Sequence, residues 1–135
     1  MNGYPWQVMI ADPHDPKLVD RTNVLRVATT DPIDHAVYLS QALKGDFLTR
    51  VLIHELGHCA MISFNLIEEI HRMVYPEYWI DAEERICNFI ADYGMTILNT
   101  GYSILGNYEG AWMFVPKEIE RMLLNTDWRR SLQWI

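Results

Sequence analysis

Two histidines stand four residues apart in the stretch VLIHELGHCA, residues 51–60, and a glutamate directly follows the first of them. On a helix, residues four apart lie on one face, so His54 and His58 can direct ring nitrogens at a single metal ion. Two imidazoles fill two of the four tetrahedral positions of zinc. Glu55 is offset from them and can reach a water on that ion. The pattern predicts metal-activated hydrolysis with Glu55 as the general base.

An ordinary helix with two unremarkable histidines and a solvated glutamate is the alternative interpretation. The motif lies within an apolar stretch, where unpaired polar groups are costly, and this disfavours the alternative. Gly57 removes a side chain beside the two histidines, which lets a strand or a substrate backbone approach closely. We therefore favour the metal site.

A catalytic zinc site needs a third protein ligand and keeps its fourth position for water. The extended motif HExxHxxGxxH is excluded, because Met61 and Phe64 occupy the positions of its glycine and third histidine. His71 has the wrong spacing and is expected on the surface of a short helix. A glutamate from a later helix is the remaining source, and the candidates are Glu68, Glu69, Glu83 and Glu84.

Glu84 is the preferred third ligand. Asn88 follows it by one helical turn on the same face and can accept the N–H of a ligating histidine, which fixes the tautomer of that histidine. Glu83 has Cys87 at the equivalent position, which is a poor acceptor, and Glu83 remains the alternative. A charged first turn favoured by the helix dipole would explain one of the two glutamates without a metal. The donor to a developing oxyanion stays open among four residues: His71, Tyr78, Tyr93 and Tyr102.

The elements that must position these residues follow from the hydrophobic pattern. Short apolar runs predict strands over residues 6–11, 24–29 and 35–40, with a turn at 31–34. Helical spacing predicts helices over about 46–64, 65–76, 79–100 and 115–124, with a looser stretch from Gly101 onward. Strands that precede helices indicate an α+β fold, and no linker divides residues 1–135, so we expect a single domain.

Composition limits the class of function. The net charge of −7 and the pI near 5.1 argue against non-specific nucleic-acid binding. Cys59 and Cys87 form no CxxC pair, so we expect two buried thiols in a reducing compartment rather than a disulfide. No signal peptide and no apolar run of membrane-spanning length is recognisable. These features predict a cytoplasmic protein with no membrane partner.

Two sequence elements together resemble a known family. HELGH, followed by ERICNFIA at residues 84–91, is similar to the ImmA/IrrE-type metallopeptidases, gluzincin-like zinc proteins frequent in phages and mobile elements. Residues 35–59 also resemble the strand and active-site helix of small phage-encoded members. The resemblance implies a minimal zincin core, with a short twisted sheet, the active-site helix and a glutamate helix. It implies zinc held by His54, His58 and Glu84, with Glu55 as the base.

Two functions from different classes follow. The first is a zinc metallopeptidase acting on a protein or peptide, such as a repressor or a phage protein, in the cytoplasm of a host cell. The second is a catalytically silent, zinc-stabilised phage structural or interaction component, with an oligomer or a virion assembly as its setting. The aromatic residues near the C-terminus motivate this second function, since exposed aromatics mark interfaces; they are Trp112, Phe114, Trp128 and Trp134.

Overall fold

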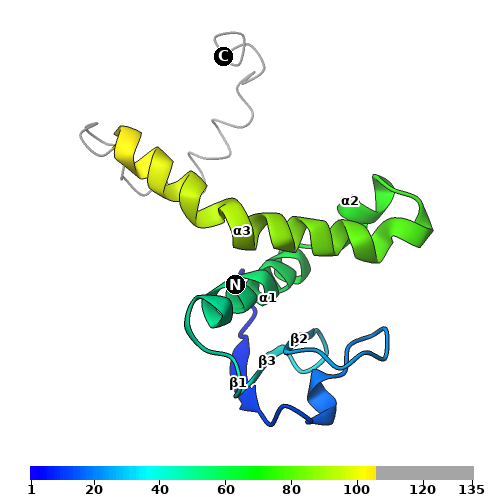
Figure 1. The fold of residues 1–135 in the computed structure, drawn as a ribbon. Coiled ribbons are helices and arrows are strands. Elements are labelled where there is room, and N and C mark those ends of the chain that lie inside the picture. The colour runs from blue at the N-terminus through cyan, green and yellow to red at the C-terminus, as the bar shows by residue number, and fades with distance from the viewer. Residues whose placement is uncertain (106–135) are drawn as a thin grey trace. The chain divides into compact units, whose positions relative to one another are not determined.

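A computed structural model gives the fold, and it describes residues 1–105 (Figure 1). The elements are β1 (Gln7–Ala11), the 3-10 turn η1 (Pro16–Leu18), β2 (Ala28–Asp31), β3 (Ala36–Ser40), α1 (Gly45–Ser63), α2 (Ile67–Arg72), η2 (Pro76–Tyr78) and α3 (Trp79–Leu105). The predicted α+β class is confirmed. The helix predicted over 115–124 and the C-terminal aromatic residues lie outside the described residues.

Residues Met1–Asn99 form one compact unit. All the residues of the predicted site belong to this unit. The prediction of one domain over residues 1–135 stays a prediction.

β3 is the central strand of a three-stranded sheet with the order β1-β3-β2. It pairs in parallel with β1 and antiparallel with β2, and all five of its residues are buried. Val37 and Leu39 join a core cluster with Val51 and Cys59 of α1, whereas Ala36 and Tyr38 pack with Leu18 of η1. The strand is apolar along its whole length because both of its faces are covered.

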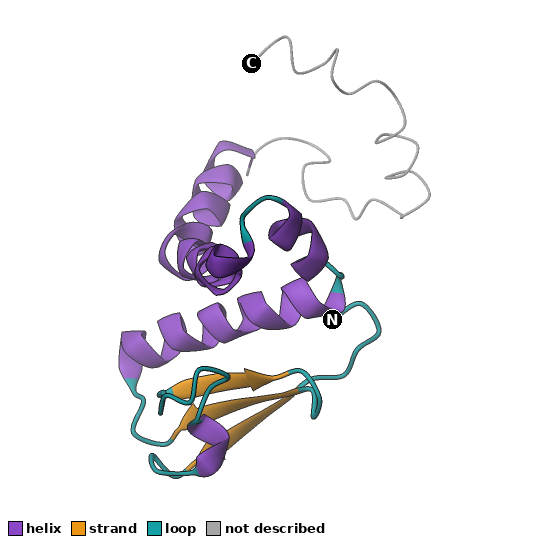
Figure 2. Ribbon diagram, turned by 90° about the vertical axis from the view of Figure 1, so that its right-hand side faces the viewer, coloured by secondary structure: helices purple, strands orange, loops and turns teal. Residues whose placement is uncertain are grey.

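Within the Met1–Asn99 unit the elements form layers. Figure 2 shows α1 lying along one face of the sheet, with α3 crossing it on the side away from the strands. α1 ends where Asn65 takes a left-handed conformation, with φ of 57°, and the N–H of Leu66 donates to the carbonyl of Met61 at 2.8 Å. This reversal, followed by α2 and η2, returns the chain so that α3 crosses α1.

The second predicted strand is misplaced. β2 begins at Ala28 rather than Val24, and residues 20–26 form a loop organised by the Asp20 carboxylate. That carboxylate accepts hydrogen bonds from the backbone N–H groups of Thr22 and Val24, at 2.8 and 3.1 Å. Asp side chains that bond nearby backbone in this way compete with strand pairing. The alternating apolar residues of VLRVAT at 24–29 therefore predicted a strand that the hydrogen bonds of Asp20 prevent from forming before Ala28.

The helices follow the predictions more closely. α1 matches the predicted range to within one residue at each end, and Asp46 lies in its first turn. α2 is shorter than expected, and Pro76 opens η2 rather than simply stopping a helix. α3 continues through Gly101 to Leu105, so the predicted loosening at Gly101 is wrong. No helix within residues 1–105 combines the length and hydrophobicity needed to cross a membrane.

Candidate metal centre and cleft

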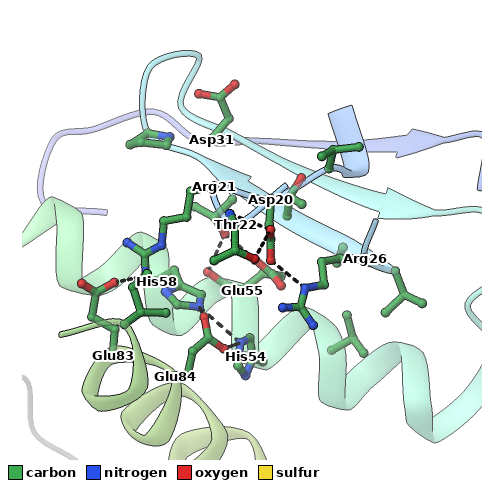
Figure 3. Close-up of a pocket in the computed structure, with 18 of the residues that line it drawn as sticks. Asp20, Arg21, Thr22, Arg26, Asp31, His54, Glu55, His58, Glu83 and Glu84 are labelled. Atoms are coloured by element: carbon green, nitrogen blue, oxygen red, sulfur yellow. Dashed lines mark hydrogen bonds and ion pairs between the residues drawn. The ribbon is translucent and has the colours of Figure 1, made fainter. Parts of the chain in front are cut away.

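The predicted site residues line one cleft. It has a volume of about 1210 Å³ and lies between the loop before β2, the middle of α1 and the first turns of α3. His54, Glu55 and His58 come from α1, and Glu84 and Asn88 come from α3. Figure 3 shows Glu84 reaching up from α3 toward the two histidines. Residues thirty positions apart are thus brought together by the crossing of the two helices.

Three groups that could ligate a metal ion, two imidazoles and one carboxylate, lie within contact distance of one another. The Nε2 atoms of His54 and His58 are 3.2 Å apart. Glu84 Oε2 lies 3.2 Å from His54 Nε2, and Glu84 Oε1 lies 3.3 Å from His58 Nε2. Ligands at about 2.0–2.1 Å from one tetrahedral ion are separated by about 3.3 Å. The spacing and the chemistry of the donor set fit such an ion, and they favour Glu84 over Glu83.

The Nδ1 atom of His54 faces the Oδ1 atom of Asn88 at 3.1 Å. An amide oxygen only accepts, so Nδ1 carries the proton. Nε2 would present its lone pair to a bound ion, and in the absence of an ion a protonated Nε2 can donate to Glu84. This is the arrangement predicted for Asn88. The hydrogen bond to Glu84 raises the pKa of His54, although burial opposes it, and hydrogen bonds from His54 and His58 hold the pKa of Glu84 well below its usual range. The pocket thus favours a carboxylate paired with positive charge.

Glu55 is nearly buried, with 7% of its surface exposed, and it lines the same cleft. Its Oε2 accepts a hydrogen bond of 2.7 Å from the hydroxyl of Thr30 in β2. A buried carboxylate needs such a donor, and this one leaves the second carboxylate oxygen, Oε1, outside that hydrogen bond. β2 therefore positions the predicted general base.

Cys87 is a second candidate donor beside the histidines. One nitrogen of each histidine and the Cys87 sulfur lie within 4.8 Å of one another. The thiol is fully buried, and burial raises the pKa of Cys87 to about 12. Its sulfur also lies 3.0 Å from the place where a Cβ on Gly57 would stand. The direct contacts of Glu84 with both histidines make the carboxylate the better third donor.

Glu83 is not a solvated first-turn acid, and His71 is not a surface residue. The Glu83 side chain is 3% exposed and accepts from Arg21 Nη2 and His71 Nε2, each at 2.6 Å. The His71 ring stacks on Trp79 at a centroid distance of 4.4 Å. The expectation for His71 was wrong because it rested on sequence distance from HELGH, whereas α3 brings Glu83 against α2. His71 lines the cleft, as one of the four candidate oxyanion donors.

Sequence reasoning did not single out Thr30, Arg21 or Arg26, which all line the cleft. Thr30 was left outside the strand predicted over 24–29, and no local motif marks the arginines. Cys59 and Cys87 are both buried free thiols, as expected. Comparisons of the chain with family models, curated proteins and solved structures give no match.

Proposed function

We propose that this chain is a zinc-dependent metallopeptidase of the gluzincin type, with His54, His58 and Glu84 as the metal ligands. The observation that carries the proposal is the triangle of donor contacts, with separations of 3.2, 3.2 and 3.3 Å, in a cleft that also holds Glu55. The sheet, α1 and α3 occur in the order that a minimal zincin core requires, which supports the ImmA/IrrE-type resemblance.

Each residue has a defined task in this proposal. When bound, zinc supplies Lewis acidity that lowers the pKa of a coordinated water from about 15.7 to about 7. Glu55 accepts the proton of the attacking water and delivers it to the leaving amine. Thr30 keeps the Glu55 carboxylate in place, and Asn88 keeps the His54 ring in its ligating tautomer.

The cleft fits an extended substrate better than a small molecule. Its volume of about 1210 Å³ exceeds the range usual for small-ligand pockets. We therefore propose a protein or peptide substrate. A reducing cytoplasm is the proposed setting, because both thiols are free.

The test pairs metal content with hydrolysis. We expect about one zinc per chain in protein purified without a chelator, and cleavage of a general substrate such as fluorescent casein. Glu55→Gln should keep the zinc and lose the cleavage, since it removes only the base. Glu69→Gln, on an exposed position of α2, is the matched control and should change neither. Cleavage by Glu55→Gln at the wild-type rate would refute the mechanism.

A further inference from the structure

The loop before β2 places two arginines at the cleft. Arg21 and Arg26 both line it, and Figure 3 shows them on either side of the group formed by His54, His58 and Glu84. Neither belongs to the predicted metal site. Their side chains are about half exposed, at 52% and 53%.

Arg26 is fixed from within its own loop. Its Nε donates to Asp20 Oδ2 at 2.6 Å, and the same aspartate is held by the backbone and hydroxyl of Thr22. The pair with Asp20 uses the Nε side of the guanidinium and leaves its two terminal nitrogens without a hydrogen-bond partner within residues 1–105. The hydrogen bond to Asp20 raises the pKa of Arg26, so the guanidinium stays charged.

Arg21 is held by a residue of α3, on the other side of the cleft from its own loop. Its Nη2 crosses the cleft to Glu83 Oε2 at 2.6 Å, and Glu83 is itself held by His71. A buried carboxylate with two partners is a rigid anchor. Arg21 uses one terminal nitrogen in this contact, and its other guanidinium N–H groups have no hydrogen-bond partner within the described part of the chain.

The other lysine and the other arginine that line the cleft each contact two side chains. Lys17 contacts both Asp31 and Asp34, and Arg50 contacts Asp92 and Asn88. Arg21 and Arg26 therefore each keep guanidinium N–H groups that have no hydrogen-bond partner among residues 1–105, beside the proposed catalytic groups. A planar guanidinium with paired N–H donors matches a carboxylate in geometry as well as charge.

We propose that Arg21 and Arg26 bind carboxylate groups of the substrate next to the cleaved bond. This inference rests on the proposed metallopeptidase function and names its substrate class: peptides that carry an acidic side chain or a free C-terminus beside the scissile bond. The acidic chain as a whole repels such peptides, so the two arginines supply the local attraction that admits them.

The test measures binding, with a zinc-anchored probe. Four dipeptides carry an N-terminal malonyl hydroxamate followed by Glu-Ala or Gln-Ala, each as the C-terminal acid and as the amide. Calorimetry with the zinc-loaded wild type gives their affinities. We expect each added carboxylate that reaches an arginine to tighten binding roughly fivefold to tenfold. Comparison of the four probes distinguishes a side-chain carboxylate from a C-terminal one.

Variants assign the effect to the arginines. Arg26→Gln, and Arg21→Gln combined with Glu83→Gln so that no buried carboxylate is left unpaired, should each reduce the gain from a carboxylate. Arg72→Gln, outside the cleft and 76% exposed, should leave it unchanged. Equal affinity of all four probes, with binding still dependent on zinc, would overturn this inference and leave the metallopeptidase intact. Probes that bind equally well without zinc would overturn both.

Discussion

His54 is held at both nitrogens of its ring, and this makes Asn88 a positioning residue. Nδ1 donates to Asn88 while Nε2 faces His58 and Glu84. We predict that Asn88→Ala weakens zinc binding by about 10–100-fold, because the ring is then free to rotate and to change tautomer. Competition with a zinc chelator of known affinity measures this change.

Asn99→Ala provides the control, since Asn99 is an exposed residue of the same helix. Its zinc affinity should equal that of the wild type. Unchanged affinity in Asn88→Ala would show that the amide plays no part in holding the histidine.

For single residues, the sequence predicts contacts between positions at helical spacing and misses contacts between positions far apart in the chain. His54 and His58 are four residues apart, as are Glu84 and Asn88. Residues four apart lie on one face of a helix, so this spacing predicts the shared faces correctly. The contact between Arg21 and Glu83 joins residues 62 positions apart, and that between Thr30 and Glu55 joins residues 25 apart. No local pattern encodes these pairs, because they depend on which loop faces which helix.

The crossing of α1 and α3 depends on a close approach at Gly57. A Cβ there would lie 3.0 Å from the Cys87 sulfur and 3.4 Å from the Cys87 Cα. We predict that Gly57→Ala lowers the free energy of unfolding by roughly 1 kcal/mol, because the cost of overpacking exceeds the gain in helix propensity. Thermal or urea unfolding measures the change.

Two further variants separate crowding from other effects. With Cys87→Ala in the same chain, the remaining contacts are 3.4 and 3.5 Å, so the loss caused by Gly57→Ala should shrink. Gly94→Ala meets only Ile90 at 3.6 Å and should be neutral or stabilising. A loss for Gly57→Ala that is equally large with and without Cys87 would contradict the packing argument.

The loop over residues 20–26 is held by one ionised carboxylate. Burial raises the pKa of Asp20, but hydrogen bonds from Thr22, Arg26 and Val24 outweigh it and hold the pKa well below the ordinary value of 3.8. A lowered pKa means that the ionised group stabilises the fold above pH 3.8 and that this contribution is lost as the pH falls further. Asp20→Asn should therefore cost about 1 kcal/mol at pH 7 and progressively less below pH 4.

Urea unfolding of both proteins at several pH values between 3 and 7 measures this difference. Asp46→Asn, at an exposed position in the first turn of α1, serves as the control and should show a smaller difference. A gap between wild type and Asp20→Asn that stays constant down to pH 3 would mean that the charge of Asp20 does not hold the loop.

Helices and strands were predictable where burial gives the sequence a recognisable hydrophobic pattern. They were not predictable where a side chain forms hydrogen bonds with nearby backbone groups in place of strand pairing. The central strand and α1 were placed well, because β3 is buried on both faces and α1 packs one face on the sheet. The predicted second strand began four residues before β2 does. The Asp20 carboxylate holds residues 22 and 24 in a loop by hydrogen bonds to their backbone N–H groups, and the hydrophobic pattern gives no sign of these bonds.

Across the whole Met1–Asn99 unit, the proposed zinc ion joins two helices that share one close crossing. α1 supplies two ligands and α3 supplies the third, so binding should stabilise the unit as well as the site. At a free zinc concentration one hundred times the Kd, the gain is about 2.7 kcal/mol, which for a unit of this size corresponds to a rise in Tm of roughly 13 °C. Thermal unfolding with and without a chelator measures this rise.

The same measurement decides between the two candidate third ligands. Glu84→Ala should abolish the zinc-dependent rise, since it leaves only two imidazoles on one helix. Cys87→Ala should keep most of it, because in the proposed site the sulfur packs against Gly57 and the carboxylate binds the ion. The reverse result would assign the ion to His54, His58 and Cys87. Such a site would still tie α1 to α3, but it would free Glu84 and require a different arrangement of the hydrolytic groups.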